Sequence, residues 1–223
     1  MTQFGFSIHP TPRLVTDEQI AQFSTLAVAN ISDAMSRTNG TSHLRPFHRS
    51  GRVVGRALTV KTAPGDNLMV HKAINMAAAG DVIVVDAGGS TLNAIIGEIM
   101  SAEAARRGVV GFVIDGAIRD SDVLGKDDFA VFARGVSHRG PYKEGPGEIN
   151  VPISIDGMVV MPGDLIVGDS DGVLAIRPEI ASELAQQVIL IEKKEQLILA
   201  EIANGESDRS WVDETLRKKG VNV

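Results

Sequence analysis

Two pairs of polar residues near the middle of this 223-residue sequence have types and a spacing that suit a binding site. Gly97-Glu98 precedes an alanine-rich segment, and a helix that starts there would offer free backbone N–H groups to a carboxylate or phosphate. After twenty intervening residues, Arg119 can hold an anion with its forked guanidinium, and Asp120 suits a hard cation such as Mg²⁺. The two pairs therefore predict a site for an anionic molecule and a metal ion, with Arg119 and Asp120 facing different ligands rather than each other.

Each pair also has an ordinary structural explanation. A glutamate in the first turn of a helix, such as Glu98, interacts favourably with the helix dipole. Arg119-Asp120 after a strand is typical of a solvated ion pair or a turn. Gly88-Gly89 does not belong to a phosphate loop of the GxxxxGK[ST] kind, because no lysine follows at the required position. The spacing between the two pairs is what favours a shared site.

Two short apolar runs, residues 81–86 and 109–114, read as the buried strands that position these pairs. The segment between them, residues 97–107, is helical by its alanines. A strand, helix and strand in this order predict parallel pairing with a right-handed crossover. Ligands collect beyond the carboxyl ends of such strands, so we expect the loops 86–90 and 115–120 to share one rim.

The rest of the chain reads as one α/β domain, residues 1–223, with an arm over 1–15 and a helical tail over 178–223. Thr16 and the acidic residues after it predict a helix start, and Ser210 is expected to cap a last short helix. Residues 140–150, rich in glycine and proline, read as an extended loop, and residues 122–129 as a short helix or turn. The other expected elements are helices over 26–35, 68–79 and 178–203, and strands over 51–62, 130–134, 151–155, 158–160 and 165–175.

Composition excludes several classes of function. The chain has no cysteine, which rules out disulfides, thiolate catalysis and zinc–thiolate sites. A net charge of −6 and an aromatic content of 4% argue against nucleic acid as a partner. No apolar run reaches the roughly 18 residues that a membrane span needs, and no signal peptide is recognisable. We therefore expect a cytoplasmic protein with neither nucleic-acid nor membrane partners.

The two pairs together resemble the signature D-x20-R-D of the class II pyruvate aldolases in the RraA-like superfamily, a group that contains 4-hydroxy-4-methyl-2-oxoglutarate aldolases. The resemblance covers roughly residues 15–200. Further similar segments are residues 31–34, 65–67, 145–150, 162–164 and 169–172. This resemblance implies a single domain of the swivelling β/α/β type, which is a layered sandwich with parallel and antiparallel strands and a C-terminal helix.

The same resemblance implies a role for each site residue. Arg119 would bind pyruvate and act in catalysis, and Asp120 would hold the divalent metal, Mg²⁺ or alternatively Mn²⁺. Glu98 would hold a water that moves the proton, although the family signature has aspartate at this position. The implied substrate-binding residues are Gly97, Glu98, Ile99, Met100 and Arg119.

The implied activity is retro-aldol cleavage of a 4-hydroxy-2-oxo acid to pyruvate, with oxaloacetate decarboxylation through the same pyruvate enolate. The implied assembly is a homotrimer or a hexamer. The alternative is a non-catalytic protein that binds and regulates ribonuclease E, a branch that lacks the Arg-Asp pair. A menaquinone-pathway methyltransferase finds no support, because no glycine-rich S-adenosylmethionine loop follows a strand.

Several other polar residues remain open candidates. His71 follows the loop Gly65-Asp66-Asn67 and is either structural or part of the pocket, and Asp33 is expected to cap a helix. Four residues in the loop before residue 150 either carry function or pack against a neighbouring subunit: His138, Arg139, Lys143 and Glu148. Three acidic residues in the tail are candidates to approach a neighbour's metal: Glu201, Asp213 and Glu214.

Overall fold

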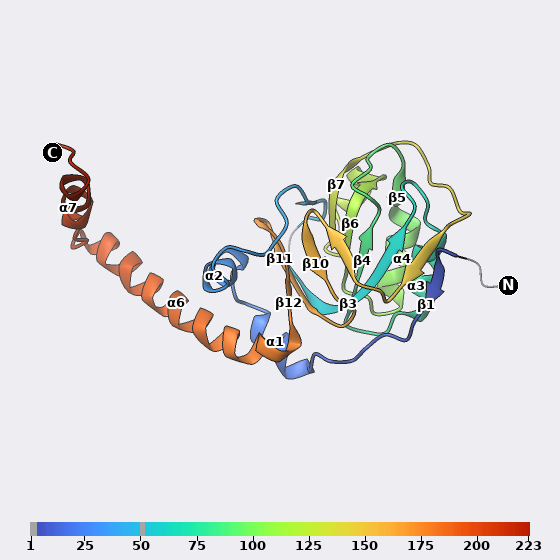
Figure 1. Cartoon of the computed structure of the whole chain (residues 1–223), viewed down its shortest axis with the longest axis horizontal. Coiled ribbons are helices and arrows are strands. Elements are labelled where there is room, and N and C mark those ends of the chain that lie inside the picture. Colours follow the sequence, from blue (N-terminus) through green and yellow to red (C-terminus); the bar gives the residue numbers. More distant parts are fainter. Residues whose placement is uncertain (1–3, 50–51) are drawn as a thin grey trace.

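A mixed sheet of ten strands forms the centre of the computed structural model, which describes residues 4–49 and 52–223 (Figure 1). The strands of this sheet are β1 (Phe6–Ile8), β2 (Arg45–Pro46), β3 (Val53–Thr62), β4 (Asp81–Asp86), β5 (Ala94–Ile96), β6 (Gly111–Ile118), β7 (Ala130–Val136), β8 (Gly147–Ile149), β11 (Leu165–Asp169) and β12 (Gly172–Ile176). A separate antiparallel hairpin consists of β9 (Ile153–Ile155) and β10 (Met158–Val160). The helices are α1 (Asp17–Phe23), α2 (Val28–Ala34), α3 (Leu68–Met76), α4 (Glu98–Arg106), α5 (Ser121–Leu124), α6 (Pro178–Asn204) and α7 (Ser210–Lys218).

Four parallel strands run side by side in the order β3, β4, β6 and β7. The expected parallel pairing of the strands over 81–86 and 109–114 is confirmed, because β4 and β6 are parallel neighbours. Antiparallel strands flank this centre, with β11 and β8 on β3 and β2 on β7. The predicted α/β class with parallel and antiparallel strands is therefore confirmed.

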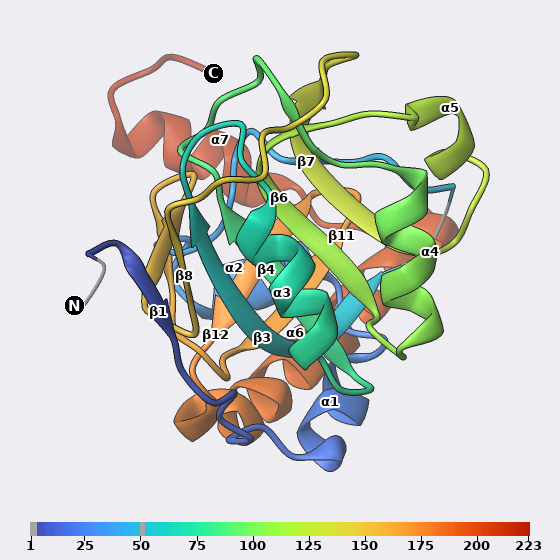
Figure 2. The ribbon, with the colours of Figure 1, turned by 90° about the vertical axis from the view of Figure 1, so that its right-hand side faces the viewer.

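Different elements cover the two faces of the sheet. Helices α3 and α4 lie on one face, as Figure 2 shows, and bury Val70 and Ala104 against Ile83 and Phe112. The β9–β10 hairpin covers the other face. Helices α1, α2 and the first half of α6 pack against β11 and β12 in a third cluster. Strand β3 contributes apolar side chains to both faces of the sheet, because neighbouring residues of a strand point to opposite sides.

Several local signals in the sequence correspond to the observed element ends. The side chain of Thr16 accepts a hydrogen bond from the backbone of Gln19, and Gln19 returns one to Thr16, which makes a capping box at α1. Pro178 occupies the first turn of α6, and Gly205 ends that helix in the left-handed conformation.

Two predicted caps are wrong. Asp33 lies near the end of α2 and pairs with Arg37, with 2.6 Å between its Oδ1 and the arginine Nε. The start of α2 is instead capped by Asp169, whose Oδ2 accepts a hydrogen bond of 2.9 Å from the backbone N–H of Val28. At α7 the N-cap residue is Arg209, and Asp208 before it accepts a hydrogen bond of 2.8 Å from the backbone N–H of Ser210. The cap of α2 comes from elsewhere in the fold and therefore leaves no local pattern in the sequence.

The loop expected over 115–120 starts too early, because β6 continues through its first residues to Ile118. Pairing with β5 and β7 keeps this stretch extended. Strands β1, β2, β5 and β8 were not predicted, and each has only two or three residues. Strand β1, within the expected arm, pairs with β8, within the expected loop. Of the strand expected over 51–62, Gly51 lies outside the described residues.

The second half of α6 leaves the body of the protein and carries α7 at its end (Figure 1). Every residue of α6 from Lys193 onward is exposed. Several large apolar side chains are among the exposed residues of this tail: Leu190, Leu197, Leu199, Ile202 and Trp211. No helix within residues 4–49 and 52–223 combines the length and apolar character that crossing a membrane requires. The expected homotrimer or hexamer stays a prediction.

Candidate functional site

The short strand β5 brings the two polar pairs together beside β6. Ile96 of β5 pairs with Ile118, and its carbonyl accepts a hydrogen bond of 3.0 Å from the backbone N–H of Arg119. Gly97 therefore follows β5 at the point where Arg119 follows β6, and it is the N-cap residue of α4. The predicted proximity of the two pairs is thus present in the fold.

Gly97 is required at this point by close approach rather than by its backbone angles. Its φ of −156° is extended and open to any residue. A Cβ atom at this position would lie 2.4 Å from Oδ2 of Asp120 and 2.9 Å from Cγ of Arg119. Only glycine lets both side chains pass this close to the start of α4.

Asp120 has the left-handed backbone conformation, with φ 57° and ψ 34°. Such a conformation is uncommon outside glycine, costs of order 1 to 3 kcal/mol, and is enriched at functional sites. The carboxylate of Asp120 reaches the start of α4, where its Oδ2 accepts a hydrogen bond of 3.0 Å from the backbone N–H of Glu98. The other oxygen, Oδ1, has no hydrogen-bond or ion-pair partner within the described residues, and the side chain is 37% exposed.

The donor set around Asp120 fits a weakly anchored hard cation. Across residues 4–49 and 52–223, no group of three or more His, Asp or Glu side chains could hold a metal ion. Mg²⁺ commonly binds through only one or two protein carboxylates and completes its shell with water and substrate oxygens. The free Oδ1 of Asp120 is such a ligand, so the residues present fit this group.

Arg119 and Asp120 lie closer to each other than the sequence reasoning expected. The guanidinium Nε of Arg119 is 3.6 Å from Oδ2 of Asp120, which is within ion-pair distance. The prediction that these two residues do not interact with each other is therefore wrong. Both side chains are more than one third exposed, so the pair contributes little stability. The terminal nitrogens of Arg119 remain available to a ligand.

A pocket of about 260 Å³ opens beside Arg119. Its lining consists of Asn67, His71, Ile95, Ile96, Gly97, Ile99, Met100, Arg119, Gly140, Pro141 and Lys143. Arg119 and Lys143 are cationic, and no carboxylate lines the pocket. The backbone N–H groups of Ile99 and Met100, in the first turn of α4, have no hydrogen-bond partner within the described residues. The pocket therefore suits a small anionic molecule.

The side of the pocket opposite α4 is held in place by Asp66 and Asn67. Oδ2 of Asp66 accepts hydrogen bonds from the backbone N–H groups of Glu144 and Gly145, at 2.6 and 2.9 Å. These bonds fasten the loop that carries Lys143. The side-chain nitrogen of Asn67 donates to the carbonyl of Ile95 at 2.8 Å, while its Oδ1 is buried without a hydrogen-bond partner.

The structure divides the predicted site residues into two groups. Gly97, Ile99, Met100 and Arg119 line the pocket, whereas the side chain of Glu98 is exposed and does not. Asp120 lies next to it and lines a neighbouring hollow of about 390 Å³ that also includes His138.

Among the open candidates, His71 and Lys143 line the pocket. Glu148 instead accepts a hydrogen bond of 2.8 Å from Ser7, and Arg139 uses its backbone carbonyl to hold Ala94. Three acidic residues lie on the projecting tail of Figure 1: Glu201, Asp213 and Glu214. Asn67 also lines the pocket, although no role was predicted for it. It precedes His71 by four residues and so shares its helical face.

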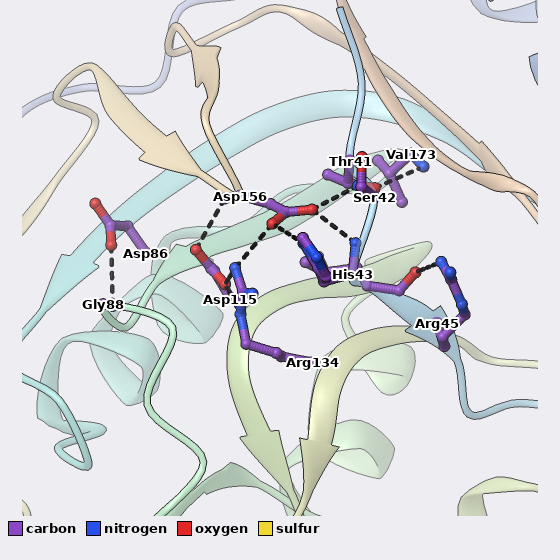
Figure 3. A network of polar contacts seen from close by, with 11 residues as sticks. Thr41, Ser42, His43, Arg45, Asp86, Gly88, Asp115, Arg134, Asp156 and Val173 are labelled. Carbon is purple, nitrogen blue, oxygen red and sulfur yellow. Dashed lines mark hydrogen bonds and ion pairs between the residues drawn. The ribbon is translucent and has the colours of Figure 1, made fainter.

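The glycine loop after β4 lies beside Asp115, as the expected common rim requires, but it lines a different hollow from the pocket of Arg119. Residues 86–89 of this loop lie near Asp115, Arg134 and Asp156. Figure 3 shows this polar network, in which Arg134 bonds Asp115 at 2.6 Å and Asp156 at 3.1 Å. Asp156 also accepts hydrogen bonds from the backbone and ring of His43, at 2.7 Å each.

The network in Figure 3 fastens the β9–β10 turn to the sheet. Burial acts to raise the pKa of the Asp156 carboxyl, but hydrogen bonds from His43 and Ser42 and the charge of Arg134 outweigh it and hold that pKa well below its usual range. The charged form of Asp156 is therefore stabilised by folding.

Comparison with known proteins places the chain in a family. The RraA-like family model, described as Aldolase/RraA, matches residues 28–175. A protein of Halalkalibacterium halodurans named "Putative 4-hydroxy-4-methyl-2-oxoglutarate aldolase" is 48% identical over 158 residues, which cover 70% of this chain and 75% of that protein.

Solved structures are similar over most of the chain. An uncharacterized protein from Pseudomonas syringae pv. tomato has a TM-score of 0.78 and 27% identity, covering 89% of this chain and 96% of its own. The RNA-processing inhibitor RraA from Thermus thermophilis has a TM-score of 0.62 and 30% identity, covering 67% of this chain and 92% of its own. The matched family model, the aldolase-named relative and these structures agree, and the chain belongs to the RraA-like family.

Proposed function

We propose that this protein is a divalent-metal-dependent lyase that cleaves a 4-hydroxy-2-oxo acid to pyruvate. The observation that carries the proposal is a small pocket with cationic side chains and no carboxylate, beside an aspartate with a free oxygen. The name of the relative from Halalkalibacterium halodurans supports the same reaction class. Decarboxylation of oxaloacetate belongs to the proposal, because it passes through the same pyruvate enolate.

The chain's residues provide the positioning and charge that this reaction needs. The carboxylate of the pyruvyl unit binds to Arg119 and to the free backbone N–H groups of Ile99 and Met100. When the C3–C4 bond breaks, its electron pair moves into the pyruvyl unit and negative charge develops on the C2 oxygen. The guanidinium of Arg119 stabilises that charge within the pocket.

A divalent cation would be held by Asp120, whose Oδ1 is free. The group would supply Lewis-acid stabilisation of the enolate oxygen. Gly97 keeps Asp120 and Arg119 against the start of α4. Arg119 and Asp120 are consecutive residues, so the anion and the cation would bind side by side.

The test is pyruvate release from a panel of 4-hydroxy-2-oxo acids and from oxaloacetate, with EDTA and after Mg²⁺ is restored. We expect activity in the wild type that EDTA abolishes and Mg²⁺ restores. Asp120→Ala should lose the Mg²⁺-stimulated turnover while its unfolding midpoint stays near that of the wild type. Asp33→Ala removes an exposed carboxylate on α2 and serves as the control. Full Mg²⁺-stimulated decarboxylation in Asp120→Ala would refute the metal assignment.

A second candidate function is inhibition of an RNA-processing enzyme by protein binding. It is favoured by the 30% identity to the RraA structure from Thermus thermophilis. The two functions are separated by adding the purified chain to a ribonuclease E cleavage assay. Inhibition that persists in Asp120→Ala, together with no pyruvate release by the wild type, would support the second candidate over the lyase.

A further inference from the structure

The wall of the pocket formed by α3 includes Asn67 and His71. Asn67, at the start of α3, is 2% exposed, and its Oδ1 is buried without a hydrogen-bond donor. His71 lies one helical turn later on the same face and also lines the pocket. Its ring makes no hydrogen bond or ion pair within the described residues. A ligand in the pocket therefore meets the imidazole as an available acceptor, whereas Oδ1 of Asn67 is enclosed in the wall.

The imidazole of His71, which no other described residue binds, indicates what kind of ligand group belongs there. A neutral imidazole has one ring nitrogen that accepts a hydrogen bond, so a bound ligand that supplies a donor to it gains that bond. The pyruvyl part of a 2-oxo acid offers only acceptors, namely its keto and carboxylate oxygens. The C4 hydroxyl is the donor that a 4-hydroxy-2-oxo acid adds, which assigns this group to the wall formed by Asn67 and His71.

The charges around His71 favour the neutral imidazole. The charged side chains that share the pocket with it are Lys143 and Arg119, and both are cations. Partial burial of the ring, and after it the charge of Lys143, lower the pKa of His71 below its ordinary value. A neutral imidazole is a proton acceptor at pH 7.

The other candidates for a proton acceptor are placed less well. The carboxylate of Glu98 is exposed and does not line the pocket. Asp120 lines the neighbouring hollow, and its Oδ2 is occupied by the backbone N–H of Glu98. The amide oxygen of Asn67 accepts hydrogen bonds but is too weak a base to take a proton. Of the described residues that line the pocket, His71 is the one with a basic nitrogen that is not a cation at neutral pH.

We propose that His71 is the general base of the retro-aldol reaction and removes the proton of the substrate's C4 hydroxyl; this inference rests on the proposed lyase function. The hydroxyl lies against the wall formed by α3, beside the imidazole, and its proton passes to the ring nitrogen. The O–H electron pair forms the new C4 carbonyl, the C3–C4 bond breaks, and its electron pair forms the pyruvate enolate. The enolate takes a proton at C3 from water, and the imidazolium returns its proton to water.

This assignment separates the two reactions of the site. Cleavage of a 4-hydroxy-2-oxo acid needs removal of a hydroxyl proton, whereas oxaloacetate loses carbon dioxide without any such step. Loss of the base should therefore slow the first reaction and spare the second. A merely structural role for His71 would slow both reactions by the same factor, because they share the pyruvate pocket.

The experiment compares wild type, His71→Gln and the control His9→Gln, which changes an exposed histidine in the N-terminal arm. The measurements are kcat and KM for 4-hydroxy-4-methyl-2-oxoglutarate and for oxaloacetate, with Mg²⁺ present. In His71→Gln we expect kcat for the hydroxy acid to fall by about 10² to 10⁴, the usual range for a general base, with KM changed by less than about threefold. Oxaloacetate decarboxylation should stay within about threefold of the wild type, and pyruvate should inhibit both proteins equally.

The pH profile supplies a second readout. The acid limb of kcat/KM for the hydroxy acid, where activity falls as the imidazole gains a proton, should be absent in His71→Gln. Equal losses in the two reactions, or no loss in either, would overturn the role of His71 and leave the lyase function standing. A wild type that releases pyruvate from no substrate of the panel would overturn both proposals.

Discussion

The replacement Gly97→Ala tests whether the contact between the two polar pairs determines activity. The new Cβ would lie 2.4 Å from Oδ2 of Asp120, whereas ordinary contacts begin near 3.4 Å, so the carboxylate must move by about 1 Å. That movement lengthens the hydrogen bond from the backbone N–H of Glu98 and also displaces Arg119, whose Cγ is 2.9 Å away. A displacement of about 1 Å at reacting groups costs roughly 10² in rate, or about 2.7 kcal/mol in the activation free energy.

The stability of the fold should hardly change, because the two displaced side chains are partly exposed and flexible and the backbone of Gly97 is already extended. The assay measures kcat/KM for oxaloacetate with saturating Mg²⁺, together with the urea midpoint of unfolding. Gly135→Ala is the matched control, since its Cβ would meet only the exposed Thr91, at 3.3 Å. Wild-type activity in Gly97→Ala, or a loss of activity accompanied by an equal loss in the control, would refute the reasoning.

Two other replacements test the ligand contact of Arg119 and the polar network. Arg119→Lys keeps the charge but loses the forked hydrogen bonds, so the inhibition constant of pyruvate should rise by about tenfold in a competition assay; an unchanged constant would contradict the assignment. Asp156→Asn removes the charge that Arg134 and His43 bind, and should lower the free energy of unfolding by about 2 to 3 kcal/mol in urea at pH 7. Because folding lowers the pKa of Asp156, its contribution is complete above the unfolded-state value near 4 and is lost as the pH falls below it. The stabilities of wild type and variant should therefore converge in acid, and a constant difference down to pH 2 would contradict this account.

Much of the central fold could be predicted because its signals are local. The continuous apolar run of β4, the alanines of α4 and the glycine after it specify a strand, a helix and a stop within a few residues. The short strands could not be predicted in this way. Strand β5 has three residues, and it becomes a strand because β6 offers it an edge.

The candidate site shows the same division. The spacing in the sequence predicted that the pairs Gly97-Glu98 and Arg119-Asp120 meet. They are in contact, because the backbone N–H of Glu98 donates to Oδ2 of Asp120. The sequence did not indicate which side chains point into the pocket, since Glu98 turns to solvent while Asn67 and His71 face the ligand space. That outcome depends on α3 packing beside α4, an arrangement between elements thirty residues apart.

The sequence by itself determined the α/β class, the parallel pairing of β4 and β6, and the residue types available for binding an anion and a cation. These features follow from hydrophobic periodicity and side-chain chemistry, which are encoded residue by residue. Only the tertiary structure decided that Asp120 and Arg119 contact each other, that a carboxylate-free pocket lies beside them, and that the glycine loop after β4 serves another hollow. These features depend on distances between segments far apart in the chain, which are set when helices and strands pack together.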